Sequence, residues 1–151
     1  MRSLSGSLLI LVSGLLVAQT SQELHSRYGD PDRERFAARP GISVTVEYGS
    51  DRLACEVLVE PPQALLSGVD QMSLMSSDAV TEVLEEMVPL GSRGSQIRSL
   101  LTNSGCNQVR LTDYAHVSIM RSTHNCLPLK PEHEMRATIT FKRDICRTQR
   151  K

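Results

Sequence analysis

The feature that most constrains the fold is an alternation of apolar and polar residues across positions 42–60. Apolar side chains occupy every second position on both sides of a turn: Ile42, Val44, Val46, Tyr48, Leu53, Cys55, Val57 and Val59. A period of two is typical of a β-strand with one buried face. A hairpin with residues 49–52 as its loop places these side chains on one face. In that register the facing pairs are Val46 with Cys55, Val44 with Val57 and Ile42 with Val59.

Two later segments alternate in the same way and predict a second hairpin. One carries Ala115, Val117 and Ile119, and the other carries Ala137, Ile139 and Phe141. Between them lies a loop at 122–134 that is rich in proline and charge. A further short strand is expected at 108–111.

Helical spacing follows the first hairpin. After Ser77 or Asp78 as cap, one apolar stripe comprises Ala79, Val80, Val83, Leu84, Met87 and Val88, and Pro89 ends the helix. A turn at 91–95 is expected to lead into a shorter helix that carries Ile97, Leu100 and Leu101. A third, solvated helix is predicted at 31–36, with Asp30 as cap and Pro31 at its first position.

These elements predict a single α+β domain at residues 41–146. Its core would be a small, mainly antiparallel sheet of two hairpins, with two helices on one face and disulfides as cross-links. A charged N-terminal arm at 21–40 is expected before the domain, and a basic tail at 147–151 after it.

The first 20 residues have the pattern of a secretory signal peptide. Arg2 precedes an apolar run at 8–18, and small residues follow that run. The run is shorter than the roughly 20 apolar residues that a membrane-spanning helix needs. We therefore expect a secreted or periplasmic protein with no membrane span after signal removal.

Four cysteines, all after the predicted signal, indicate two disulfides in an exported domain. If the second hairpin forms, Cys106 and Cys146 lie at one end of it and Cys126 lies in the far loop. This arrangement favours Cys106 with Cys146 and Cys55 with Cys126, and the two other connectivities stay open.

Charge and aromatic content exclude some ligand classes. The whole chain has 17 basic and 17 acidic residues, and removal of Arg2 leaves 16 against 17. Such a balance does not favour nucleic acid or an anionic membrane surface. Aromatic residues make up 3% of the chain and tryptophan is absent, which disfavours a site that stacks sugars or bases.

Few residue patterns in the chain suggest catalysis. His116, His124 and His133 lie near Cys126, and imidazole with thiolate can hold zinc or copper. Their spacing matches no zinc motif, and an oxidised cysteine cannot be a ligand. No cofactor or metal is therefore expected, and a metal-binding protein or metal-dependent enzyme that uses the three histidines is the alternative.

Other candidate groups are weaker. A cysteine and histidine nucleophilic pair would need a free thiol, which an even number of cysteines disfavours. The glutamates at 82, 85 and 86 are expected to face water from one helix. Glu132 and Glu134 flank His133, but a zinc-protease helix would need a second histidine that is missing.

Three strings together resemble a group of small, exported, uncharacterised proteins of soil bacteria. They are residues 27–36, with Arg27, Tyr28 and Gly29; residues 39–41, which run into the first strand; and residues 121–131. The resemblance implies export and a disulfide-bonded domain, and it implies no activity.

The sequence thus favours a non-catalytic extracytoplasmic module that binds a protein or an envelope component. Its binding surface is expected at the loop 122–134, because rigid disulfide-bonded scaffolds commonly display their functional residues on loops.

Overall fold

The computed structural model of the protein describes residues 21–62, 75–124 and 133–148. The chain divides into two compact units, residues 1–31 and 32–151. In the first unit, helix α1 spans Ser21–Tyr28. It ends at Gly29, which has a φ of +83° and donates its N–H to the carbonyl of His25. A left-handed glycine is a common ending of a helix.

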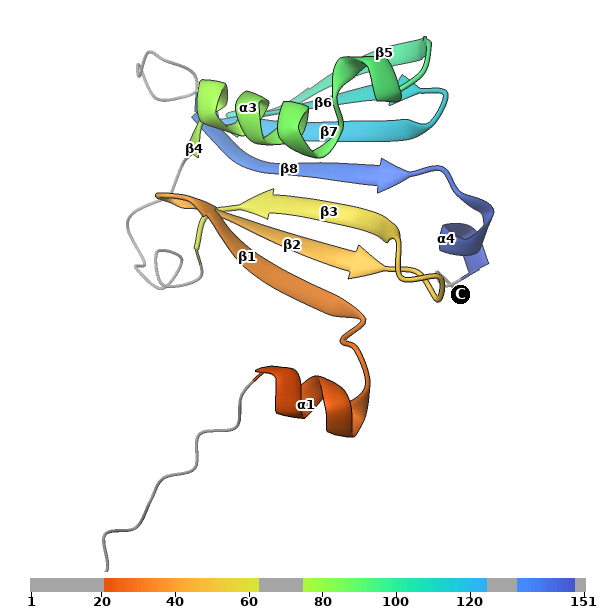
Figure 1. Cartoon of the computed structure of the whole chain (residues 1–151). Helices are drawn as coiled ribbons and strands as arrows, with labels where there is room; N and C mark the ends of the chain where they lie inside the picture. Colours follow the sequence, from red (N-terminus) through yellow and green to blue (C-terminus); the bar gives the residue numbers. More distant parts are fainter. Residues whose placement is uncertain (1–20, 63–74, 125–132, 149–151) are drawn as a thin grey trace, which may run out of the picture. The chain divides into compact units, whose positions relative to one another are not determined.

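In the described part of the second unit, eight strands form one antiparallel sheet in the order β1-β2-β3-β8-β7-β6-β5, and β4 pairs with β8 (Figure 1). The strands are β1 (Arg33–Arg39), β2 (Ile42–Tyr48), β3 (Ala54–Glu60), β4 (Met75–Ser76), β5 (Gln96–Ser104), β6 (Asn107–Tyr114), β7 (Val117–His124) and β8 (His133–Phe141). Three strands from the start of the unit thus meet a four-strand meander along the β3–β8 contact.

Three helical segments accompany this sheet. Helix α3 spans Ser77–Met87 and is followed by the short 3-10 turn η1 (Leu90–Ser92), while α4 (Asp144–Thr148) follows β8. Figure 1 shows α3 on one face of the sheet, which we call the helix face. The predicted helix that ends before Pro89 is confirmed, although its cap residue is Ser76 rather than Ser77 or Asp78.

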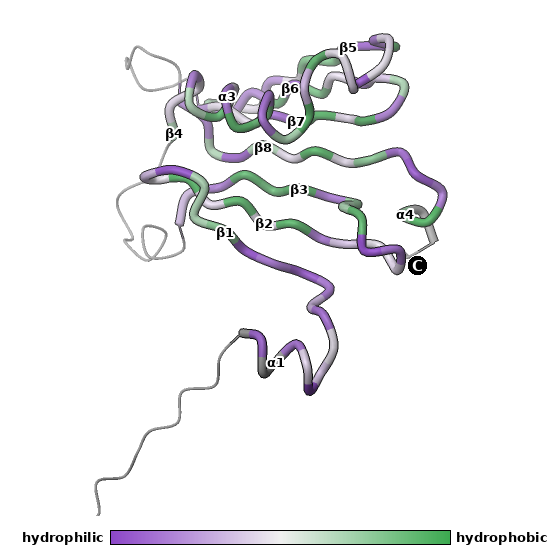
Figure 2. The backbone as a smooth tube through the Cα atoms, viewed as in Figure 1, coloured by the Kyte–Doolittle hydropathy of each residue, from purple (hydrophilic) through white to green (hydrophobic). Residues whose placement is uncertain are grey.

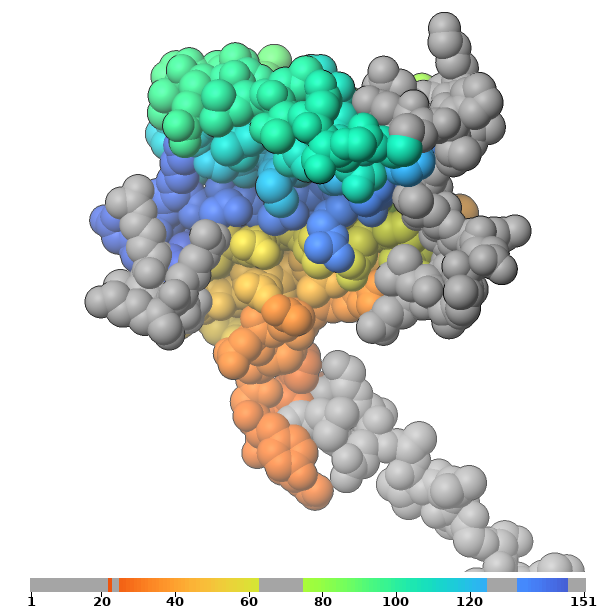
Figure 3. All heavy atoms as spheres, turned by 180° about the vertical axis from the view of Figure 1, so that it is seen from behind, coloured from red at the N-terminus to blue at the C-terminus, as the bar shows by residue number. Residues whose placement is uncertain are grey.

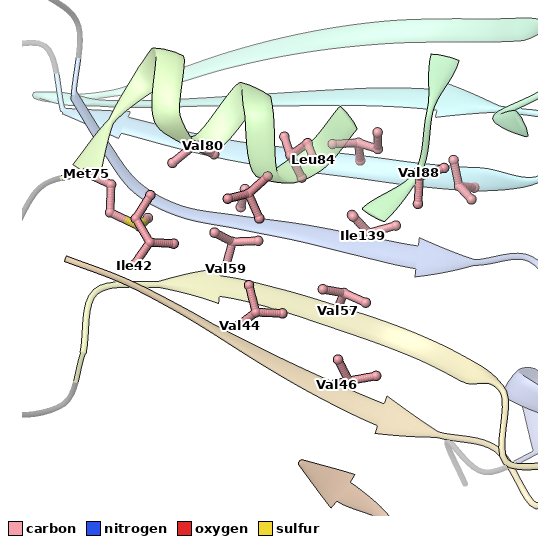
Figure 4. Close-up of a cluster of buried hydrophobic side chains, with 14 residues drawn as sticks. Ile42, Val44, Val46, Val57, Val59, Met75, Val80, Leu84, Val88 and Ile139 are labelled. Carbon is pink, nitrogen blue, oxygen red and sulfur yellow. The ribbon is translucent and has the colours of Figure 1, made fainter. Parts of the chain in front are cut away.

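The core lies between the helix face and α3. Val80, Val83, Leu84 and Val88 follow α3's apolar stripe and are buried against the central strands (Figure 4). The sheet contributes Ile42, Val44, Val46, Val57, Val59, Val117, Ile119, Ala137 and Ile139. In Figure 2, hydrophobic residues recur along β2, β3 and β8, in agreement with this core. Burying this apolar area is the main force that holds helix and sheet together.

The predicted α+β architecture is wrong. A large antiparallel sheet dominates the described residues, and one helix, rather than two, packs on the helix face. The expected helix with Ile97, Leu100 and Leu101 is instead β5, which pairs along β6. Spacing of three and four residues suits a helix, but hydrogen bonding to a neighbouring strand overrides such a local preference.

The solvated helix predicted at 31–36 is also wrong. Residues from Arg33 on form β1, which pairs with β2 from Arg33 opposite Glu47 to Arg39 opposite Ile42. The sheet thus begins inside the segment expected as a charged arm.

The first predicted hairpin is confirmed, but its register is shifted by two residues. Val46 faces Val57 and Val44 faces Val59. An irregularity at Glu47 and Tyr48 and a longer turn, in which Arg52 adopts a φ of 63°, account for the shift. Because the shift is even, Val44, Val46, Val57 and Val59 still face the core, whereas Leu53 lies in the turn and is 59% exposed.

The second predicted hairpin is confirmed as β7 and β8, with Ile119 opposite Ile139. The strand expected at 108–111 is confirmed within β6. Most of the loop between β7 and β8, like the predicted signal peptide at 1–20, lies outside the described residues.

A disulfide joins Cys55 on β3 to Cys146 on α4, with a Cα–Cα distance of 5.3 Å. The favoured pairs Cys106 with Cys146 and Cys55 with Cys126 are therefore wrong. The end of β8 lies beside the start of β3 rather than beside the β5–β6 turn, so Cys146 reaches Cys55. Cys106 is also disulfide-bonded, and Cys126 lies outside the described residues.

Candidate functional site

An irregularity in β8 turns an acidic side chain into the helix face. Ser122 pairs with Arg136, but the next residue, Thr123, pairs with Glu134. Met135 is therefore an extra residue, and a bulge of this kind reverses the face on which the following side chains lie. Alternation counted back from Ala137 would point Glu134 away from α3, whereas its side chain is 0% exposed.

The buried Glu134 carboxylate is bound on one oxygen. Its Oε1 accepts a hydrogen bond of 2.7 Å from the Ser77 hydroxyl and forms an ion pair with the Arg121 guanidinium. Its Oε2 has no hydrogen-bond partner among the described residues. A buried carboxylate is stable only with such charged partners, and its second oxygen leaves one acceptor available to a donor.

Arg121 joins Glu134 to the beginning of α3. Its guanidinium donates to the Ser77 carbonyl at 3.3 Å and to the Thr81 hydroxyl at 3.0 Å. Ser77 had been expected to cap the helix with its side chain, but Ser76 is the cap residue and the Ser77 hydroxyl turns to Glu134. The carboxylate and the positive end of the helix dipole therefore lie together.

Two cavities share a pair of arginines in their walls. A cavity of about 120 Å³ is lined by Ser77, Gln108, Arg110, Arg121, Thr123 and Glu134. Another, of about 160 Å³, is lined by Thr81, Leu84, Glu85, Arg93, Arg110, Thr112, Tyr114, Ile119 and Arg121. Because both include Arg110 and Arg121, we call them together the arginine cleft.

The strand register explains why the cleft is polar. Arg110 on β6 faces Arg121 on β7, and Gln108 faces Thr123 in the next row. The helix face is therefore apolar on β2, β3 and β8 but polar on β6. Arg110 is exposed, and its side chain forms no hydrogen bond or ion pair with another residue of the described ranges.

The third arginine of the larger cavity, Arg93, is already neutralised. Arg93 is 8% exposed, and it donates to the Val88 carbonyl at 2.9 Å and to Glu85 at 2.6 Å. Its guanidinium also lies over the ring of Tyr114. Arg93 therefore fixes the turn after α3. Because Arg121 is paired with Glu134, the positive charge of the cleft that is left for a ligand is that of Arg110.

The structure does not bring the three predicted histidines together. His116 precedes β7 and His124 ends it, so about eight residues of extended strand, roughly 26 Å, separate them. His133 begins β8, and the His124 ring contacts Asn107 at 3.1 Å. Within residues 21–62, 75–124 and 133–148, no group of three or more His, Cys, Asp or Glu is placed to hold a metal.

The glutamates of α3 do not simply face water. Glu82 and Glu86 form ion pairs with Arg39, and Glu85 pairs with Arg93. They tie the helix to the end of β1 and to the following turn.

Arg110 is the functional candidate that sequence reasoning missed, and Glu134 was considered only as a neighbour of His133. Glu134 lies near the start of β8, and its burial depends on the bulge at Met135 and on Arg121, 13 residues earlier. The alternation of Gln108, Arg110 and Thr112 on a strand was the available signal, because three polar residues on a core-facing side suggest a lined cavity.

Comparison with known proteins identifies no function. No family model matches the sequence, and no curated protein matches it. A solved structure of a DUF4309 family protein from Bacillus subtilis is similar over 86% of this chain and 84% of that chain, with 14% identity and a TM-score of 0.35.

No helix in the described parts of the chain is long and apolar enough to cross a membrane.

Proposed function

We propose that the protein is a non-catalytic, extracytoplasmic binding module that holds an anionic group of its ligand in the arginine cleft. The observation that carries the proposal is Arg110, an exposed arginine without a partner among the described residues, beside Arg121 in a polar cavity. Guanidinium groups bind carboxylates and phosphates through paired hydrogen bonds.

The size of the cleft suits a group rather than a whole ligand. A cavity of about 120 Å³ is smaller than the roughly 300–1,000 Å³ of pockets that bury a whole small-molecule ligand, and it has room for one carboxylate or phosphate. The rest of the ligand would extend along the neighbouring cavity or into solvent. This geometry supports recognition of a terminus or side group on a larger molecule.

The other polar groups of the cleft support binding rather than chemistry. Glu134 is neutralised by Arg121, so it lowers the net positive charge without cancelling that of Arg110. Gln108 and Thr123 add neutral hydrogen-bonding groups to the wall.

Export of the protein is part of the proposal. The Cys55–Cys146 disulfide is the kind of cross-link that persists in oxidising compartments. The predicted signal peptide at 1–20 and the oxidised state of Cys106 agree with that location. The loop between β7 and β8, expected to carry the binding surface, is flanked by Thr123 and Glu134 of the cleft.

Titration of the ¹⁵N-labelled, oxidised protein with inorganic phosphate, and separately with succinate, tests the proposal at constant ionic strength in chloride. We expect saturable chemical-shift changes at the amides of Ser77, Gln108 and Thr123, with the more effective anion indicating the ligand's chemical group. Arg110→Gln should abolish saturation.

The matched control is Arg136→Gln on the opposite face of the sheet. Arg136 is also an exposed strand arginine, and its ion pair with Glu60 is 3.5 Å long. Equal weakening by Arg110→Gln and Arg136→Gln would show non-specific charge attraction. Absence of saturable shifts with either anion would disprove the proposed function.

A further inference from the structure

Strand β5 ends the sheet without protection. All nine of its residues are exposed, including Ile97 at 62%, Leu100 at 50% and Leu101 at 52%. As the last strand in the order, it pairs with β6 on one side. Its other side presents backbone N–H and C=O groups that can pair with another strand. Figure 3 shows the green-to-teal part of the chain that includes β5 along one margin of the sheet.

An apolar row on the face opposite α3 leads to this edge. The registers place Leu58, Thr138, Met120, Leu111 and Leu100 side by side across β3, β8, β7, β6 and β5. Met120 is 41% exposed and Leu100 is 50% exposed. The row therefore becomes most exposed towards β5 and stops at Leu100.

We propose that a second copy of the chain pairs with this edge, β5 against β5 about a two-fold axis at Leu100. The inference is independent of the arginine cleft, because Arg110 lies on the helix face. Leu100 would face its own counterpart, so that the apolar row continues from one sheet into the next. Antiparallel neighbours of this kind are in direct side-chain contact.

The charges of β5 permit this self-pairing. With Leu100 at the axis, Arg98 faces Thr102 of the second copy, Ile97 faces Asn103, and Ser99 faces Leu101. Like charges directly opposite each other would destabilise the pair, and this register contains none. Arg98 already pairs with Asp113 of its own chain at 3.4 Å.

The assembly would close at two copies. A two-fold pairing uses the same surface on both chains, so β5 is consumed in one contact. The other end of the strand order, β1, carries charged residues and an irregularity between Ala37 and Arg39, which are features that oppose strand addition.

Single-cysteine cross-linking tests the register. In the Leu100→Cys dimer, the Cα atoms of the two new cysteines face each other at about 4.5–5.5 Å, which is within the Cα–Cα range of a disulfide. Mild oxidation should give a covalent dimer, with the new linkage identified by peptide mapping. In the matched Thr102→Cys variant the new thiols are offset by four residues, roughly 13 Å, and should not link. Equal cross-linking of the two variants would overturn the register.

Sedimentation of the oxidised protein tests the interface without new cysteines. We expect a dimer for the unmodified chain and a monomer for Leu100→Lys, whose lysines would face each other across the axis. Phe36→Lys on β1 is the control. The exposed fraction of Phe36, 46%, is similar to the 50% of Leu100, and this change should leave the dimer intact. Circular dichroism checks that each variant folds. A monomeric unmodified chain, or a dimer that survives Leu100→Lys, would overturn the proposal.

Discussion

Strands β1 and β5 end the same sheet, yet their side chains are engaged to different extents. Arg33 pairs with Glu47, Arg35 with Glu60 at 3.5 Å, and Arg39 with two glutamates of α3. Strand β5 has one ion pair among the described residues, Arg98 with Asp113. One edge is therefore tied to its neighbours by charge, and the other leaves its side chains exposed.

The same contrast extends to the two halves of the sheet. The β1–β3 half supplies most of the apolar helix face and is cross-linked to the C-terminal helix by Cys55–Cys146. The β5–β7 half carries the polar arginine cleft and the exposed edge. We infer that the first half is the scaffold and that the second half presents the binding surfaces. Exposed apolar groups and unpaired polar groups in a cavity reduce stability, so their presence in the second half indicates that they make contacts with other molecules.

The largest expected effect comes from Arg121→Met, which disconnects α3 from the β5–β7 half. It removes the ionic partner of fully buried Glu134, and breaking such a pair costs about 3 to 5 kcal/mol. Chemical denaturation should show this loss in the free energy of unfolding. The double replacement Arg121→Met with Glu134→Leu should recover much of it, since it leaves no buried charge. A loss below about 1 kcal/mol, as for a surface pair, would mean that Glu134 is solvated.

Removal of the disulfide by Cys55→Ala with Cys146→Ala weakens the other half. The bond spans 91 residues of chain, and its loss should cost about 2 to 4 kcal/mol. Hydrogen exchange measured by mass spectrometry should accelerate first at the ends of β3 and β8. If exchange accelerates equally in β5 and β6, the two halves do not differ in the way described.

Gly94→Ala disturbs the entry into β5. Gly94 has a φ of +77°, and an added Cβ would lie 2.8 Å from the Cβ of Ala115 and 2.8 Å from the His116 ring. Strain of this kind costs about 1 to 3 kcal/mol, measurable as a lower melting temperature. Gly91→Ala is the control, because its added Cβ would meet no atom within 4 Å. Equal effects of the two changes would show that the turn relaxes.

The smallest effect concerns the single ion pair of β5. Hydrogen bonds from Lys142 and Ser118, together with Arg98, hold the pKa of Asp113 below its usual value of 3.8. A lowered carboxyl pKa stabilises the fold above about pH 4, and this stabilisation is lost as the pH falls through the folded-state pKa. Asp113→Asn should therefore be slightly less stable than the unmodified chain at pH 7. The difference in stability should shrink as the pH falls below about 4, and a difference that does not change with pH would contradict the assignment.

Parts of the fold could be predicted because their signals are local. Period-two alternation located β2, β3, β7 and β8, and the stripe that contains Val80 and Leu84 located α3. The same reasoning failed for β5 and β1. Ile97, Leu100 and Leu101 have helical spacing, and Pro31 suggested a helix start, but pairing with β6 and β2 decided both segments.

The candidate site was harder to predict than the fold. Histidines and cysteines are candidates because of their chemistry. The cleft is instead made by arginines and a glutamate, which are common surface residues. Arg110 and Arg121 lie 11 residues apart in sequence and become neighbours through the β6–β7 register. No sequence spacing marks such a pair, because the length of the turn sets which residues face each other.

The sequence by itself determined which side chains must be hidden from water, since the alternation on β2, β3, β7 and β8 holds whatever their partners are. It also predicted that cysteines would be cross-linked, as Cys55 and Cys146 are. Only the tertiary structure decided which strands are neighbours, where Glu134 turns inward and which edge stays open. These outcomes depend on contacts between residues distant in the chain, and a single bulge or an extra turn residue changes them without altering the local pattern.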